Sequence, residues 1–178
     1  MTDSSLLLSI DPGARGCGCA WWGKDATGWV LLQAGYTPGS PGKGDTGPPE
    51  WGAAVAAVEE ASRALLGALR PGIIVVEQMQ VYTRLKGDPR DLLAIASVGG
   101  GLFRAFSDAR PVGLLPSRWK GQVPREVMGN RIEEQVRRLG WWPRVQVPPR
   151  RTNLNDVMHG IGLGVYYARF PVLSVGQP

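Results

Sequence analysis

Two acidic residues in this chain each end an apolar run. Asp11 follows Leu-Leu-Leu-Ser-Ile at 6–10, and Glu77 follows Ile-Ile-Val-Val at 73–76. Runs of this kind predict buried strands, so each carboxylate should lie at the C-terminal edge of a sheet, where open α/β sheets bind their ligands. A tight turn at Asp-Pro-Gly explains Asp11 at least as well when it is taken alone. For Glu77 the alternative is a salt bridge to a nearby arginine.

A further pair of polar residues lies in the last predicted helix. Asp156 should fall in its first turn, where the helix dipole favours an acid, and His159 lies three residues later on the same face. His159 is the only histidine in the sequence, and a single histidine near a helix start is more often structural than a ligand. Converging acids, however, repel one another unless a cation lies among them. Because Mg²⁺ prefers carboxylate and phosphate oxygens, the combination indicates a metal-dependent enzyme acting on phosphodiesters.

The elements that must position these residues form an alternating pattern. Strands are predicted over 5–11, 16–24, 28–35, 72–77 and 112–115, and helices over about 49–69, 88–106, 125–139 and 154–169. A turn at 25–28 makes a hairpin of the second and third strands, and Asp88 before Pro89 is typical of a helix N-cap. Residues 37–49, rich in glycine and proline, should form a surface loop. The pattern predicts a mixed α/β sheet.

Glycines interrupt two of the predicted helices. Gly99, Gly100 and Gly101 favour close packing of the predicted helix 88–106 against a neighbour. Those at 160, 162 and 164 should let the last helix lie close to the sheet, at some cost in helix propensity.

Composition and length indicate an ordinary folded domain. The chain has 178 residues, of which 43% are hydrophobic and 20% charged, and we expect one domain over 1–178. No apolar stretch reaches the roughly 20 residues that span a bilayer, and residues 1–5 lack the features of a signal peptide. We therefore expect a cytoplasmic protein without membrane contact. Cys17 and Cys19 should be reduced, packed thiols.

The basic charge favours an anionic partner. The net charge is +5 and the pI about 9.6. Residues 118–151 carry many arginines with Trp119, Trp141 and Trp142 between them. Arginine with interleaved aromatic residues is typical of a surface that binds phosphates and exposed bases. A solvated basic helix and loop would account for the charge equally well.

Five short motifs follow one another along the chain: Ile-Asp-Pro-Gly at 10–13, Gly-Cys-Ala-Trp at 18–21, Val-Glu-Gln at 76–78, Pro-Ser-Arg-Trp-Lys at 116–120 and Asp-Val-Met-His-Gly-Ile at 156–161. Taken in this order, they resemble the RuvC family of Holliday junction resolvases in the RNase H-like nuclease superfamily, of bacterial or bacteriophage type. The resemblance covers roughly 6–169. It implies an α/β fold with an RNase H-like mixed five-stranded sheet, three antiparallel N-terminal strands and two parallel ones, flanked by helices in a single nuclease domain.

The resemblance also implies an activity. The chain would be a structure-selective endonuclease that resolves four-way DNA junctions by metal-dependent, paired phosphodiester cleavage, leaving 5′-phosphate and 3′-OH ends. Its catalytic and metal-binding residues would be Asp11, Glu77, Asp156 and His159, and the cofactor Mg²⁺, with two ions per site. His159 stands where the family usually has aspartate, so its role stays open and the three acids are the expected ligands. Since imidazole suits Mn²⁺ better than Mg²⁺, Mn²⁺ should also support activity.

The implied partner is branched DNA. The residues expected to contact it are Lys120, Arg125, Arg131, Arg137, Arg138 and, as an aromatic wedge, Tyr82. A four-way junction has two-fold symmetry, so the resemblance implies a homodimer, with the glycine-containing helix 88–106 as a candidate dimer face. If the chain is phage-encoded, it would act in the host cytoplasm. The alternatives are another RNase H-like nuclease that cuts RNA–DNA hybrid or RNA, and a non-cleaving junction-binding protein.

Overall fold

The computed structural model describes residues 2–13, 15–39, 48–80 and 89–170. Its strands are β1 (Thr2–Asp11), β2 (Gly16–Asp25), β3 (Gly28–Pro38), β4 (Arg70–Glu77) and β5 (Arg110–Leu114). Its helices are α1 (Pro48–Leu66), α2 (Pro89–Ala105), the single turn α3 (Pro116–Trp119), α4 (Arg125–Arg138), the 3-10 turn η1 (Trp142–Arg144) and α5 (Arg151–Arg169). None of the helices in the described ranges is long and apolar enough to span a membrane.

The five strands form one sheet in the order β3-β2-β1-β4-β5. β1, β2 and β3 are antiparallel to one another in turn, whereas β4 and β5 run parallel to β1. This is the mixed five-stranded sheet that the sequence predicted, with three antiparallel N-terminal strands and two parallel ones.

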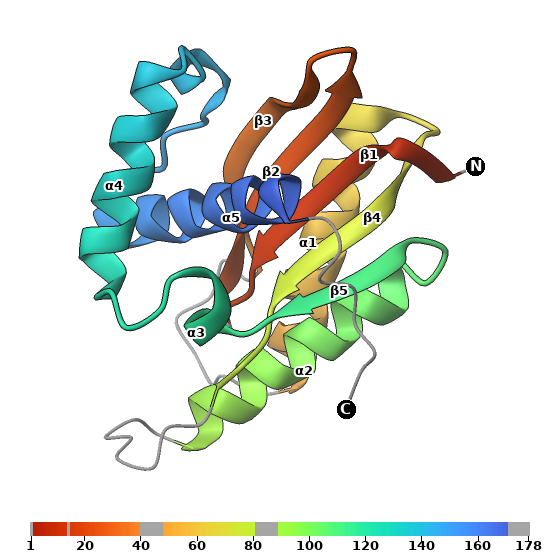
Figure 1. Cartoon of the computed structure of the whole chain (residues 1–178). Helices are drawn as coiled ribbons and strands as arrows, with labels where there is room; N and C mark the ends of the chain where they lie inside the picture. The colour runs from red at the N-terminus through yellow and green to blue at the C-terminus, as the bar shows by residue number, and fades with distance from the viewer. Residues whose placement is uncertain (1, 14, 40–47, 81–88, 171–178) are drawn as a thin grey trace.

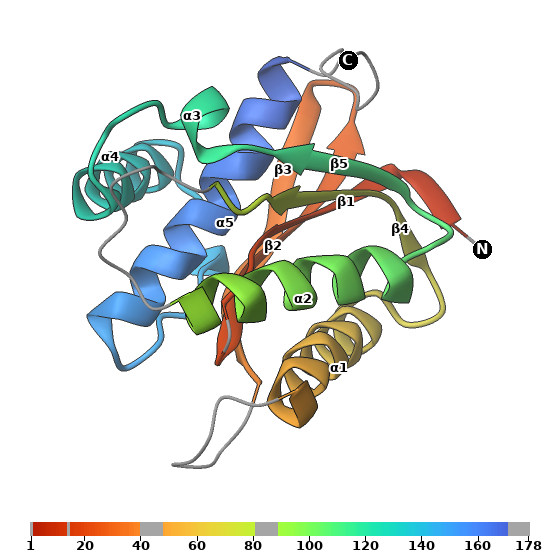
Figure 2. The same ribbon diagram turned by 90° about the horizontal axis from the view of Figure 1, so that it is seen from below.

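Helices cover both faces of the sheet. α5 lies across one face with α4 outside it, and α1 and α2 cover the other (Figures 1 and 2). Along β1, Leu8 and Ile10 belong to the core beneath α1 and α2, whereas Leu7 belongs to the core beneath α5. Because both faces are buried, β1 reads as a continuous apolar run instead of an alternating one.

Two predicted helix ends are wrong by about a turn. α1 ends at Leu66 instead of 69, because Gly67 adopts φ +64° and its amide closes on the Arg63 oxygen at 2.8 Å, which is a left-handed helix end. α5 begins at Arg151, so Asp156 lies in its second turn and not in its first.

The predicted loop 37–49 is shorter than expected. β3 extends to Pro38 and α1 begins at Pro48, and 40–47 lie outside the described residues. The predicted cap at Asp88 lies outside them as well. Of the glycines expected to pack closely in α2, Gly101 does so, since a Cβ there would lie 2.9 Å from Val55 of α1.

The segment between α4 and α5 returns to the outer edge of the sheet. Val145 forms a parallel bridge with Ala34 of β3, and the Gln146 amide donates to the Ala34 oxygen at 2.8 Å. Just before this bridge, the guanidinium of Arg137 lies 3.6 Å from the ring centre of Trp142, in a stacking contact. The far end of α4 is therefore attached to β3.

Candidate active site

Strand geometry places Asp11 and Glu77 on the same face. β1 and β4 are parallel, with Ser9 opposite Val75 and Ile10 opposite Val76, and the two acids are the next residues on their strands. Since side chains alternate along a strand, each acid points to the same face as the residue two positions earlier. That is the face covered by α5. The sequence prediction that both carboxylates lie at this sheet edge agrees with the structure.

Two facing glycines bring α5 against the sheet beside Asp11. Gly18 is the β2 partner of Asp11, and its missing side chain leaves room for the main-chain oxygen of Asp156. A Cβ on Gly160 would lie 2.6 Å from the Gly18 oxygen. The Ser9 hydroxyl donates to the Gly160 oxygen at 2.7 Å and fastens the contact. This close approach places His159 next to the acids.

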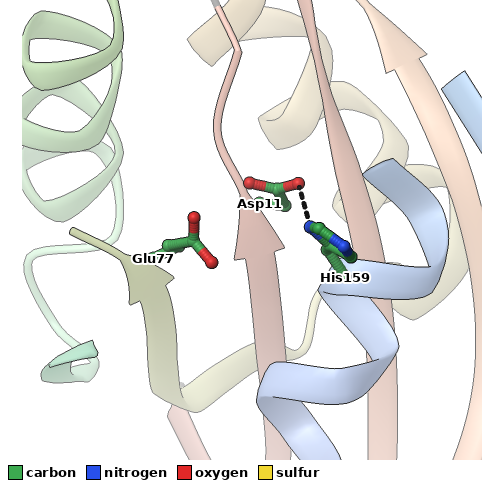
Figure 3. A group of neighbouring side chains, drawn as sticks. All are labelled: Asp11, Glu77 and His159. Carbon is green, nitrogen blue, oxygen red and sulfur yellow. Dashed lines mark ion pairs between the residues drawn. The ribbon is translucent and has the colours of Figure 1, made fainter. Parts of the chain in front are cut away.

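Three of the four predicted ligands converge. One ligand atom each of Asp11, Glu77 and His159 lies within 4.8 Å of the other two, and Figure 3 shows them projecting toward one another from β1, β4 and α5. The Nδ1 of His159 is 3.4 Å from Oδ2 of Asp11. His159 is fully buried and Asp11 nearly so. Three distant segments thus form a compact O,O,N donor set.

The hydrogen bond of the other imidazole nitrogen indicates which tautomer His159 adopts. Its Nε2 lies 3.1 Å from the main-chain oxygen of Arg125, and a carbonyl oxygen only accepts, so Nε2 carries the proton. The buried Nδ1 has no hydrogen-bond partner among the described residues. In the neutral ring this nitrogen presents a lone pair toward Asp11. An orphaned lone pair beside two carboxylates, with the opposite nitrogen bound to a carbonyl, fits a metal ligand.

The environment of Glu77 disfavours its charge. Burial raises the pKa of Glu77, as does the nearby Asp11 carboxylate, while Lys120 and the Trp119 indole N–H act in the opposite direction. Lys120 Nζ lies 3.2 and 3.1 Å from the two carboxylate oxygens, and Trp119 Nε1 donates to Oε2 at 2.7 Å. The net direction of the pKa is upward. A bound cation would relieve this unfavourable charge.

The fourth predicted ligand, Asp156, lies outside the compact set. Its carboxylate accepts from the guanidinium of Arg125, which also contacts Asp11 Oδ2 at 3.4 Å. Asp156 lines the same cleft as Asp11, Gly13, Tyr36 and Arg125, with a volume of about 470 Å³. The sequence suggested the three acids as ligands and left His159 open. The structure instead groups His159 with Asp11 and Glu77, because His159 faces the sheet and Asp156 is partly exposed.

The predicted DNA contacts differ in their availability. Lys120 and Arg125 are paired with the acids of the site. Arg137 pairs with Glu133 at 2.9 Å, whereas Arg131 and Arg138 are exposed on α4. Tyr82 lies outside the described residues. The sequence did not predict the contact of Trp119 with Glu77, because it marked Trp119 only as one of the aromatic residues among the arginines and as part of the motif 116–120.

Comparison with known proteins identifies the fold. No protein-family model and no curated protein matches the chain. Solved structures do match over nearly its whole length. RuvC of Thermus thermophilus in complex with a Holliday junction substrate has a TM-score of 0.58 and 18% identity, covering 92% of this chain and 95% of that one.

Two resolvases from other sources are equally similar in shape. The fowlpox virus Holliday junction resolvase has a TM-score of 0.59 and 15% identity, with 94% of this chain and 99% of that chain covered. The yeast mitochondrial Holliday junction resolvase Ydc2 has a TM-score of 0.59 and 10% identity, with coverages of 94% and 81%. The chain therefore has the fold of the RuvC-like Holliday junction resolvases, as its motifs predicted.

Proposed function

We propose that the chain is a divalent-metal-dependent endonuclease that resolves four-way DNA junctions by paired phosphodiester cleavage, leaving 5′-phosphate and 3′-OH ends. The observation that carries this proposal is the convergence of Asp11, Glu77 and His159 at the sheet edge. It occurs in a fold shared with RuvC bound to a Holliday junction substrate. A hydrolytic metal site in this fold favours cleavage over mere binding of the junction.

The donor set fits a divalent cation such as Mg²⁺ or Mn²⁺. Carboxylate oxygens of Asp11 and Glu77 and the Nδ1 of His159 would hold it, and Asp156 would join them when Arg125 releases its carboxylate. The chemistry that such a cation supplies is activation of water and stabilisation of negative charge on the scissile phosphate. The nitrogen ligand is the reason to expect good activity with Mn²⁺.

The basic residues around the acids would bind the DNA backbone. The Arg125 side chain is 56% exposed, so its guanidinium is free to exchange carboxylates for a phosphate. Arg131 and Arg138 present exposed cations farther along α4. Contacts to phosphates contribute affinity and salt dependence and carry no base sequence information. Recognition would therefore rest on the shape of the junction.

Symmetric cleavage requires two matched sites, so we propose a two-fold homodimer. The solvent face of α2 carries Leu93, which is 61% exposed, with Ala96 and Gly100 along the same stripe. Such small and apolar side chains permit a second helix to approach closely. Light scattering at the working concentration tests this, since a monomer that still resolves junctions contradicts the dimer.

The decisive experiment compares three substrates: an immobile four-way junction, a matched linear duplex and an RNA–DNA hybrid. Each is incubated in Mg²⁺, Mn²⁺ or EDTA with wild type, Asp11→Asn and the matched control Asp108→Asn, whose acid is exposed in the turn before β5. We expect paired, symmetric nicks in the junction alone, lost in EDTA and in Asp11→Asn and retained in Asp108→Asn. Tight junction binding without nicks would indicate a structural junction-binding protein. Preferential cutting of the hybrid would indicate another RNase H-like nuclease.

A further inference from the structure

Trp119 contacts two of the three residues in the compact donor set. Its indole Nε1 donates to Glu77 Oε2 at 2.7 Å. Its ring meets the His159 imidazole edge-on, with centroids 5.4 Å apart and planes at 82°. One side chain thus holds a carboxylate by a hydrogen bond and an imidazole by packing. Glu77 and His159 come from β4 and α5, so Trp119 links the two elements at the site.

The backbone around Trp119 holds the indole in place. α3 is a single turn closed by the Lys120 amide, which donates to the Pro116 oxygen at 3.0 Å, and the Ser117 amide donates to Oε1 of Gln80 at 3.1 Å. The ring enters a space left by Gly162 of α5, where a Cβ would lie 2.7 Å from the indole. A side chain at that position would displace the ring. Gly162 of α5 therefore provides the space that the Trp119 indole occupies.

Trp119 and Lys120 both bind Glu77, but their effects on a cation differ. Lys120 carries a positive charge within 3.2 Å of both carboxylate oxygens, so it competes with any metal for them. The indole N–H is neutral and binds only Oε2. It can therefore stay in place and orient the carboxylate while the other oxygen faces a cation.

We infer that Trp119 is a positioning residue of the metal site, whose indole N–H fixes the rotation of the Glu77 carboxylate toward Asp11 and His159. The inference rests on the proposed metal-dependent function. Carboxylate ligands are generally oriented by hydrogen bonds from outside the coordination sphere, and loss of such a bond typically weakens metal binding about 10-fold to 100-fold.

Binding of Mn²⁺ in the absence of DNA provides the test, with free Mn²⁺ measured by electron paramagnetic resonance. Trp119→Phe keeps an aromatic ring against His159 and removes only the N–H donor. The matched control is Trp21→Phe, which removes an indole bond of the same kind, to the Ser62 hydroxyl at 3.0 Å on the other side of the sheet. We expect Mn²⁺ affinity to fall about 10-fold or more in Trp119→Phe and to stay unchanged in Trp21→Phe.

Unchanged affinity in Trp119→Phe, or an equal loss in both variants, would overturn the inference. Asp11→Asn distinguishes failure of the inference from failure of the proposed function. If the proposed metal site is wrong, wild type and Asp11→Asn will bind Mn²⁺ with the same affinity. If Trp119→Phe does not fold, the wild-type indole N–H resonances during Mg²⁺ titration decide the matter. One of the seven must shift as the site saturates and stay still in Asp11→Asn; no response from any of them contradicts the inference.

Discussion

The Nε2 of His159 lies 3.1 Å from the main-chain oxygen of Arg125, the first residue of α4. The same residue extends its guanidinium to Asp11 and Asp156. The start of the basic helix is therefore joined to the donor set twice, once through its backbone and once through its side chain. If α4 moves when the protein binds DNA, the hydrogen bond to Arg125 will transmit that movement to the His159 imidazole.

Substitution of His159 should change the metal preference. His159→Asp replaces the nitrogen donor by the carboxylate that the resemblance to the RuvC family implies at this position, and carboxylates suit Mg²⁺ better than imidazole does. We expect the ratio of junction cleavage rates in Mg²⁺ and Mn²⁺ to rise relative to wild type. His159→Asn, a neutral replacement of similar size, should lower both rates together. An unchanged ratio in His159→Asp would show that His159 does not contact the metal.

Removal of the Arg125 guanidinium should strengthen metal binding and weaken DNA binding. In Arg125→Ala the carboxylates of Asp11 and Asp156 lose a competing cation. We expect the Mn²⁺ dissociation constant without DNA to fall by up to about fivefold, since solvent-exposed ion pairs contribute at most about 1 kcal/mol.

The same variant should lose about one unit of slope in the salt dependence of junction binding. Arg131→Ala is the matched control, because Arg131 is exposed on the same helix, six residues beyond Arg125. It should lose a similar salt slope and leave the Mn²⁺ affinity unchanged. If both variants leave Mn²⁺ binding unaltered, Arg125 does not compete with the metal.

The raised pKa of Glu77 predicts a pH-dependent loss of stability in metal-free protein. The folded chain keeps the Glu77 proton to higher pH than the unfolded chain, whose pKa is close to the usual 4.5. The stability of wild type should therefore decrease relative to Glu77→Gln as the pH rises above about 4.5 and level off above the raised pKa.

Thermal unfolding in EDTA over a pH series measures this difference. The comparison concerns the change of Tm with pH, so a constant offset from the unpaired Lys120 in Glu77→Gln does not affect it. Glu60→Gln, at an exposed position of α1, should follow the wild-type curve. Parallel curves for wild type and Glu77→Gln would contradict the raised pKa.

A methyl group at Gly160 should separate α5 from the sheet. The Cβ of Gly160→Ala would lie 2.6 Å from a backbone oxygen of β2, and overpacking of this kind costs about 1–3 kcal/mol of unfolding free energy. Gly52→Ala in α1 is the control, because nothing lies within 4 Å of its Cβ, and it should add about 0.5–1 kcal/mol. Denaturant unfolding measures both. Equal stabilisation by the two substitutions would disprove the close contact.

The sequence predicted the sheet well because strands that are buried on both faces consist of continuous apolar residues. β1 and β4 are continuous apolar runs that end in acids, and the alternation of side chains then fixes where those acids point. The start of α5 was missed by three residues for a physical reason. Arg150 stands at its N-cap and makes no side-chain cap hydrogen bond, so the usual polar cap signal is missing.

The interactions around the acids could not be predicted from the sequence. The bond from Trp119 to Glu77 joins residues on separate elements, and charge patterns do not reveal that Lys120 and Arg125 pair with acids inside the site. α3 is a single turn, too short to produce a helical period. His159, and not Asp156, joins Asp11 in the donor set because Gly160 packs closely against Gly18. This packing joins two segments that are far apart in the sequence, so the sequence does not reveal it.

The bridge between Val145 and Ala34 has a consequence for cooperativity. The segment that follows α4 is hydrogen-bonded to β3, and the first residue of α4 is hydrogen-bonded to His159 of α5. Local unfolding of α4 would therefore break contacts at both of its ends. Its amide protons should therefore exchange with solvent in the same cooperative unit as those of α5. A basic surface helix would in that case be as protected from local opening as the core that it covers.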